Sequence, residues 1–142
     1  MSNIDLSLLI AISRTHSALF RNIEKSLKEY DLSVSEFGVL EFLYHKGEHP
    51  VQVIANKILV TSGTITYIIS QLIKKGLVTK VKCPNDQRIF YINLTELGHS
   101  LISEIFPIHE AFLKKQFGNL EDDKKAMLVE VLFSLKENIE QN

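Results

Sequence analysis

The chain has 142 residues, 45% of them hydrophobic and 23% charged, which is typical of a soluble globular domain and excludes a disordered chain. A formal net charge of −1 gives no overall attraction for nucleic acid, and a single cysteine excludes an intramolecular disulfide and a cysteine-rich zinc site. The apolar runs are too short to cross a bilayer and the first residues lack a basic signal-peptide start, so we expect a cytoplasmic protein without membrane contact.

Apolar residues at helical spacing predict a long first helix over residues 5–30. A second helix is expected to begin in the V-S-E-F stretch, where Ser33 or Ser35 can act as its N-cap. This helix must end before Pro50, which cannot continue it.

Two short helices are predicted next, over about residues 51–58 and 62–75, and three residues connect them. Two short helices joined by a tight turn are typical of a helix-turn-helix. The second helix has a face of small or polar residues that would let its backbone approach phosphates and base edges in a major groove. The DNA-binding candidates on this face are Thr61, Ser62, Gly63, Thr64, Thr66, Tyr67 and Ser70. An ordinary helical pair with a solvated face is the alternative interpretation.

A β-hairpin is predicted from the runs LVTKVK and RIFYINL, in which side chains alternate on either side of a turn. From Lys74 to Arg88 there are five basic side chains against one acidic, a local charge of +4. Helix, turn, helix and then a hairpin with a charged tip is the order of a winged helix, and it favours DNA binding. This adds five candidates, Lys74, Lys80, Lys82, Gln87 and Arg88.

The last part of the chain predicts two more helices. One is expected from about Thr95 to Phe117, where Pro107 should kink it or cause a short break. The other is expected from about Glu121 to Glu140, with apolar residues along one side.

Two motifs carry a family resemblance. Residues 61–78 read TSGTITYIISQLIKKGLV, and D-Q-R-x-x-x-I-x-L-T follows from Asp86 to Thr95, succeeded by E-L-G-H. With these motifs the chain resembles the MarR (multiple antibiotic resistance regulator) family of winged-helix transcription factors over nearly its full length. The resemblance implies a mainly α fold with a small β-hairpin wing.

The same resemblance implies one MarR-type domain over residues 1–142. Residues 31–95 would form its winged helix-turn-helix DNA-binding lobe, and residues 1–30 with 96–142 a helical dimerisation lobe. A homodimer with two such lobes implies double-stranded DNA with a palindromic operator as the partner. The implied function is that of a transcriptional regulator, a repressor released by a small aromatic or phenolic ligand or another chemical signal.

By the resemblance, Asp86 and Arg88 are the wing pair. An arginine that a carboxylate holds on a thin loop suits a narrow, electronegative minor groove, whereas a surface ion pair of little consequence is the alternative. Two residues depart from the family pattern, because Gln87 and Tyr67 stand where arginine is common. Both departures remove positive charge.

Members of the family often lose DNA affinity when a small aromatic anion occupies the crevice between the two lobes. The candidate effector-binding residues are Arg14, His16, Phe20, Phe42 and Tyr44, although Phe20 and Phe42 also suit a hydrophobic core.

Cys83 is a candidate redox residue, since some members sense oxidants through a cysteine; an incidental surface thiol is the alternative. No metal-ligand set, cofactor motif or catalytic motif is recognisable, so we expect no enzyme. The competing function is a winged-helix module that binds protein instead of DNA, which Gln87 and Tyr67 would permit.

Overall fold

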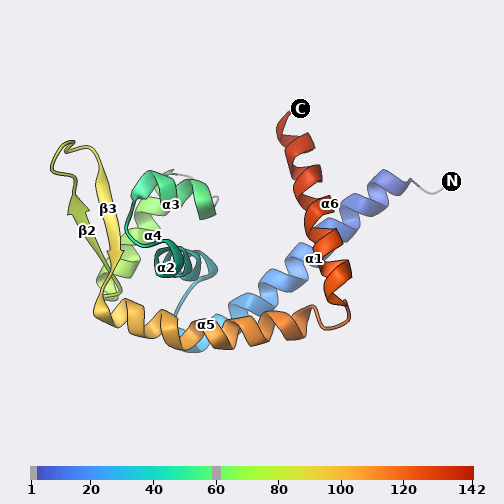
Figure 1. The fold of residues 1–142 in the computed structure, drawn as a ribbon, viewed down its shortest axis with the longest axis horizontal. Coiled ribbons are helices and arrows are strands. Elements are labelled where there is room, and N and C mark those ends of the chain that lie inside the picture. Colours follow the sequence, from blue (N-terminus) through green and yellow to red (C-terminus); the bar gives the residue numbers. More distant parts are fainter. Residues whose placement is uncertain (1–2, 59–61) are drawn as a thin grey trace. The chain divides into compact units, whose positions relative to one another are not determined.

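The computed structural model describes residues 3–58 and 62–142, and it divides into two compact units, Met1–His109 and Glu110–Asn142. Figure 1 shows the elements in chain order. The helices are α1 (Ile4–Leu27), the 3-10 helix η1 (Lys28–Tyr30), α2 (Val34–Lys46), α3 (Val51–Ile58), α4 (Ser62–Lys74), α5 (Glu96–Gln116) and α6 (Asp122–Glu140). The strands are β1 (His49–Pro50), β2 (Val78–Lys82) and β3 (Phe90–Leu94). The predicted fold class, mainly helical with a hairpin wing, is confirmed.

The first helix is shorter than predicted. It starts where expected, since the Asn3 side chain accepts a hydrogen bond from the Leu6 N–H at 3.1 Å and caps α1. The α-helix ends at Leu27, however, and residues 28–30 tighten into η1. Asp31 terminates this turn with a left-handed backbone, φ 55°, and its N–H donates to the Lys28 carbonyl.

The second helix begins with a reciprocal capping box. The Ser33 hydroxyl accepts from the Glu36 N–H, and the Glu36 carboxylate accepts from the Ser33 N–H. Of the two predicted caps, Ser33 is therefore the one that forms. The helix ends at Lys46 and is capped by Gly47, whose φ of 77° favours glycine.

The sheet has three antiparallel strands in the order β1-β3-β2, where the sequence predicts only two. The hairpin strands pair from Val78↔Leu94 to Lys82↔Phe90, and β1 joins the other edge of β3 through His49↔Ile92. A strand of two residues shows no alternation, and Pro50 is tolerated there because β1 is an edge strand. This extra strand ties the base of the wing to the start of α3.

The core lies where α2, α3, α4 and the sheet meet the end of α1 and the first part of α5. Its fully buried side chains come from each of these elements, and burial of each stabilises the fold by roughly 1.5–3 kcal/mol. They include Leu40, Ile54, Ile65, Leu72 and Ile92. Helical spacing places Ile73 in one apolar stripe of α4 with Ile65, Ile68, Ile69 and Leu72. Ile73 is nevertheless 41% exposed because it lies at the edge of that stripe.

The fifth helix runs without interruption through Pro107, so of the two predicted effects of this proline, a kink or a short break, the break is absent. A proline removes one backbone N–H, and the neighbouring turns of a long helix can hold their conformation around it. Within residues 3–58 and 62–142, no helix combines the length and the apolarity needed to cross a bilayer.

Candidate nucleic-acid interface

The fourth helix buries one face and exposes the other. Ile65, Ile68, Ile69 and Leu72 are buried against the core. The opposite face presents Thr64, Thr66, Tyr67 and Ser70 as exposed side chains, with Tyr67 65% exposed. Ser62 and Gly63 lie in the first turn of α4, and Thr61 lies outside the described residues. Four of the seven predicted residues thus lie on one accessible helix face.

The wing carries its two lysines beside an aromatic ring. The Lys80 ammonium lies 4.4 Å from the centroid of the Phe90 ring, and the Lys82 ammonium lies 5.9 Å from it. A cation held over a ring face is attracted by the ring quadrupole, so Phe90 restricts where these ammonium groups lie. Both lysines stay exposed, as contact with phosphates requires.

The predicted wing pair is present in the loop between β2 and β3. Arg88 donates to Asp86 three times: its backbone N–H to Oδ1 at 3.0 Å, Nε to Oδ1 at 3.2 Å and Nη2 to Oδ2 at 3.2 Å. The Arg88 side-chain hydrogen bonds, and next its backbone N–H, lower the pKa of the Asp86 carboxyl. The arginine side chain nevertheless remains 90% exposed. Asp86 therefore holds the guanidinium in one pose without covering it.

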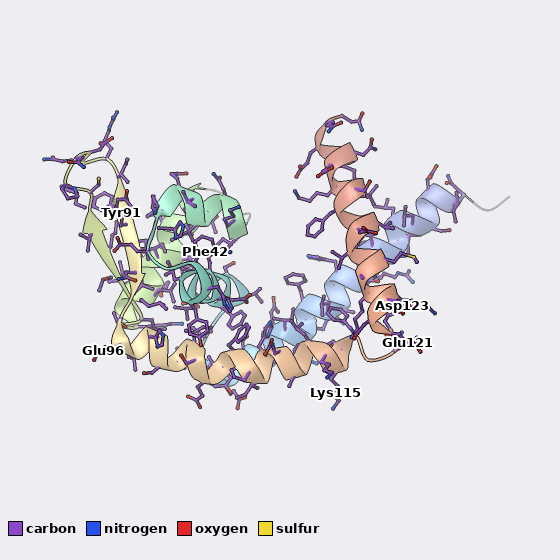
Figure 2. The ribbon with its side chains drawn as sticks, viewed as in Figure 1. Phe42, Tyr91, Glu96, Lys115, Glu121 and Asp123 are labelled. Carbon is purple, nitrogen blue, oxygen red and sulfur yellow. The ribbon has the colours of Figure 1, made fainter. Side chains whose placement is uncertain are left out.

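Helix α4 and the wing face a common recess. An open pocket of about 450 Å³ is lined by Thr66 of α4, by Lys80, Arg88 and Phe90 of the wing, and by the start of α3. Figure 2 shows Tyr91 on β3, where it pairs with Val81 on one side and with Pro50 of β1 on the other. The sheet thus fixes the wing base next to the helix-turn-helix.

Two further candidates lie at the edges of this surface. Lys74 is the last residue of α4 and is exposed. Gln87 is exposed at the tip of the wing, between Asp86 and Arg88. Together with Lys80 and Lys82 they extend the polar surface from the end of α4 along the wing.

The effector candidates are not brought together in one place. His16 and Phe20 stack on each other on α1, with centroids 4.3 Å apart, and Arg14 and Phe20 are exposed, so Phe20 is not a core residue of the single chain. Phe42 is half-buried with its ring edge-on to His49. Tyr44 belongs to a third group of rings with His45, His99 and Phe106.

Cys83 lies directly after β2 and is half-buried, and its N–H donates to the Ile89 carbonyl at 2.8 Å. It is thus placed at the base of the wing loop. Among the residues that the structure describes, no three His, Cys, Asp or Glu side chains gather into a group that could hold a metal ion.

Three residues that bear on this surface are missed by sequence reasoning. Glu36 and Lys75 form an ion pair of 2.9 Å at the C-terminal end of α4, and the ring of Phe90 lies under the ammonium group of Lys80. The S-x-x-E spacing of Ser33 and Glu36 does signal the capping box. The contact to Lys75 joins residues far apart in the chain and leaves no local pattern.

The chain is similar in sequence to one family model and to several known proteins. The MarR family model matches residues 32–90. The HTH-type transcriptional regulator MhqR of Bacillus subtilis is 36% identical over 141 residues, covering 99% of this chain and 97% of that protein. The HTH-type transcriptional repressor IacR of Pseudomonas putida is 27% identical over 129 residues, covering 91% and 77%.

Among solved structures, a mutant MarR from E. coli in complex with operator DNA superposes with a TM-score of 0.85 at 22% identity, covering 94% of this chain and 96% of that one. This likeness concerns the fold. Because the match to MhqR extends over almost the whole of both proteins, and the family model covers the helix-turn-helix and the wing as far as the first residue of β3, the chain belongs to the MarR family of transcriptional regulators.

Proposed function

We propose that the chain is a cytoplasmic homodimer that binds a palindromic operator and represses transcription there. Its action is binding, and it catalyses no reaction. Helix α4 enters the major groove and Arg88 enters the adjacent minor groove. The observation that carries this proposal is the exposed polar face of α4 beside a wing whose arginine is held by Asp86. The solved structure of the E. coli protein is a complex with operator DNA, and the similar protein of Pseudomonas putida is named a transcriptional repressor. Both support the same role here.

In this proposal residues 31–95 are the DNA-binding lobe, and residues 1–30 and 96–142 are the dimerisation lobe. Support comes from apolar side chains that the single chain leaves exposed, because large exposed apolar patches mark association surfaces. In the first unit these lie along α1: Ile4, Leu6, Leu8, Leu9, Ile10 and Ile12. In the second unit they lie along α6: Met127, Leu128, Val129, Val131, Leu132, Phe133 and Ile139.

The proposed signal is a small aromatic or phenolic ligand. Tyr44 supports this, because it is half-buried among the rings of His45, His99 and Phe106, with centroids 5.2–6.0 Å from its own. A partly open group of rings offers stacking surfaces and a phenolic hydroxyl to such a molecule. Release of the operator by members of a panel of aromatic acids and phenols tests this part.

The central experiment selects duplexes from a random library with the wild-type protein. We expect an inverted repeat whose half-sites lie about one helical turn apart, with log affinity falling linearly with log salt. In transcription from a promoter that overlaps this sequence, the protein should lower transcript yield. Weak and equal binding to every duplex would instead favour a protein-interaction module.

A further inference from the structure

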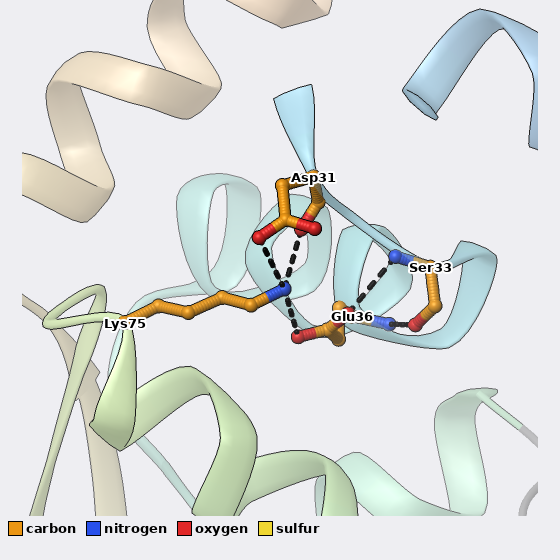
Figure 3. A network of polar contacts seen from close by, with 4 residues as sticks. All are labelled: Asp31, Ser33, Glu36 and Lys75. Carbon is orange, nitrogen blue, oxygen red and sulfur yellow. Dashed lines mark hydrogen bonds and ion pairs between the residues drawn. The ribbon is translucent and has the colours of Figure 1, made fainter. Parts of the chain in front are cut away.

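The charged side chain of Lys75, at the C-terminal end of α4, is largely withdrawn from solvent. Lys75 follows the last residue of this helix, and its ammonium lies 2.9 Å from Glu36 Oε2 and 3.8 Å from Asp31 Oδ2. It also donates a hydrogen bond to the Asp31 carbonyl. Figure 3 shows these contacts converging on the one ammonium group. We refer to Asp31, Ser33, Glu36 and Lys75 as the Lys75 network.

The anchor of this network, Glu36, is buried and hydrogen-bonded. Glu36 is 7% exposed, and its other carboxylate oxygen accepts from the Ser33 N–H at 2.9 Å. The Glu36 N–H in turn donates to the Ser33 hydroxyl at 3.0 Å. The carboxylate therefore cannot turn to follow a moving partner, and a buried charge that loses its partner is strongly unfavourable. Lys75 must stay where Glu36 holds it.

The network joins two functional parts of the chain. Asp31 ends η1, which connects α1 to α2, and it holds a left-handed backbone there. On the other side of the chain, the carbonyl of Gly76 accepts from the Thr95 hydroxyl, and the carbonyl of Leu77 accepts from the Thr95 N–H. The C-terminal end of α4 is thus fixed on both sides, by Lys75 to the α1–α2 junction and by Thr95 to the start of α5.

Lys74 and Lys75 are neighbours in the sequence but differ in what their charges meet. Lys74 is exposed, as expected of a group that contacts phosphate. The Lys75 side chain is 28% exposed, and its ammonium is directed at the oxygens of Asp31 and Glu36. An ammonium engaged in this way does not release counterions from DNA. Its effect on binding must act through the position of α4.

We propose that Lys75 is a positioning residue of the DNA interface, whose ion pair with Glu36 fixes the orientation in which α4 meets the major groove. This inference rests on the proposed function. Specific recognition needs side chains aligned with base edges, whereas non-specific binding needs only positive charge near phosphates. Loss of the Glu36 contact should therefore reduce the first and spare the second.

The test compares Lys75→Met with Lys74→Met, which removes an equal charge one position away. Affinity is measured over a range of salt concentrations, for the duplex selected by the wild-type protein and for a scrambled duplex of the same length. For Lys75→Met we expect roughly a tenfold or greater loss on the selected duplex, with unchanged affinity for the scrambled one and an unchanged salt slope. For Lys74→Met we expect similar losses on both duplexes and a slope smaller by about one.

Two further variants separate positioning from folding. Lys75→Arg keeps the positive charge opposite both carboxylates and should retain most of the specific affinity. Glu36→Gln keeps an oxygen for the Ser33 N–H but removes the charge opposite Lys75, so it should lose specificity as Lys75→Met does. Each variant is measured well below its melting temperature, established by circular dichroism.

The proposal is overturned if folded Lys75→Met and Glu36→Gln keep the wild-type ratio of specific to non-specific affinity. It is also overturned if Lys75→Met weakens both duplexes equally and reduces the salt slope, because Lys75 would then contact phosphate directly. If the wild-type protein itself selects no sequence, the proposed function fails and the inference fails with it, a result distinct from the other two.

Discussion

A Cβ atom placed on Gly98 would lie 2.0 Å from the carbonyl oxygen of Leu77. Gly98 is in the first turn of α5, and its N–H donates to the Thr95 hydroxyl at 3.0 Å. Thr95 also binds the Gly76 and Leu77 carbonyls. The absence of a side chain at Gly98 therefore lets α5 start directly against the segment that links α4 to the wing.

Gly98→Ala should destabilise the protein by roughly 1–3 kcal/mol, because the contact is with backbone and cannot be relieved by a rotamer change. The measurement is the free energy of unfolding from urea titration. Gly38→Ala is the matched control: its Cβ would lie 3.6 Å from the Ile58 side chain, an ordinary contact, in the middle of α2. That variant should be as stable as the wild type or more so, by up to about 1 kcal/mol. Equal stability of the two variants would contradict the close approach.

The helices and the wing are predictable from the sequence because periodicity and chain-breaking residues are local signals. The Asp86–Arg88 pair is equally local, since only Gln87 lies between its partners in the sequence. Contacts between distant segments leave no such signal, which is why the Lys75 network and strand β1 are missed. Periodicity also cannot tell a core face from a face that meets another chain, and Phe20 is therefore compatible with a core by its spacing although it is exposed.

Replacing Asp86 of the wing pair should have two opposing effects on DNA affinity. Removing a negative charge near DNA should by itself strengthen binding, whereas releasing the Arg88 guanidinium should weaken it. We expect Asp86→Ala to weaken binding to the selected duplex, and Arg88→Ala to weaken it by about 1–3 kcal/mol, with the dimer intact in both. Fluorescence anisotropy measures the affinity, and light scattering measures the mass.

The control for this pair is Glu48→Ala, which removes an exposed carboxylate elsewhere in the same unit. The affinity of this variant for the selected duplex should equal or exceed that of the wild type.

The lowered pKa of Asp86 means that the ion pair is present above the ordinary carboxyl pKa of 3.8 and is lost as pH falls through the lower folded value. Measurements near neutral pH therefore probe the intact pair, and unchanged affinity of Arg88→Ala there would rule out its minor-groove role.

His109 predicts a pH-dependent stability. Its ring packs on the buried Phe37, with centroids 4.5 Å apart, and burial lowers the pKa of the imidazole, an effect that the charge of Glu41 opposes. Because the folded pKa lies below the ordinary value of 6.5, the unfolded chain takes up the proton first as pH falls. The stability contributed by the neutral ring is complete above pH 6.5 and is lost as pH falls through the folded pKa.

Melting temperatures across this range should therefore fall more steeply with acidification for the wild type than for His109→Gln, which has no titrating ring at this position. Proton NMR titration of the ring measures the folded pKa directly. A His109 pKa at or above 6.5, or identical pH profiles for the two proteins, would refute the assignment.

The exposed apolar side chains of α1 and α6 predict which changes would disrupt the proposed dimer. Deletion of residues 121–142 should abolish dimerisation, and so should the single substitutions Leu9→Asp and Leu132→Asp, because each would bury an unpaired carboxylate in an association surface. Both leucines are exposed in the single chain, 63% and 44%, so neither substitution disturbs its core. Analytical ultracentrifugation gives the mass, and Ser134→Asp, which adds the same charge at an exposed polar position of α6, should remain dimeric.

A monomer has one DNA-binding lobe and can contact one half-site of the operator instead of two. We therefore expect the Leu9→Asp and Leu132→Asp variants to lose operator binding together with the dimer. A folded Leu132→Asp variant that still dimerises at the wild-type concentration would exclude α6 from the association surface.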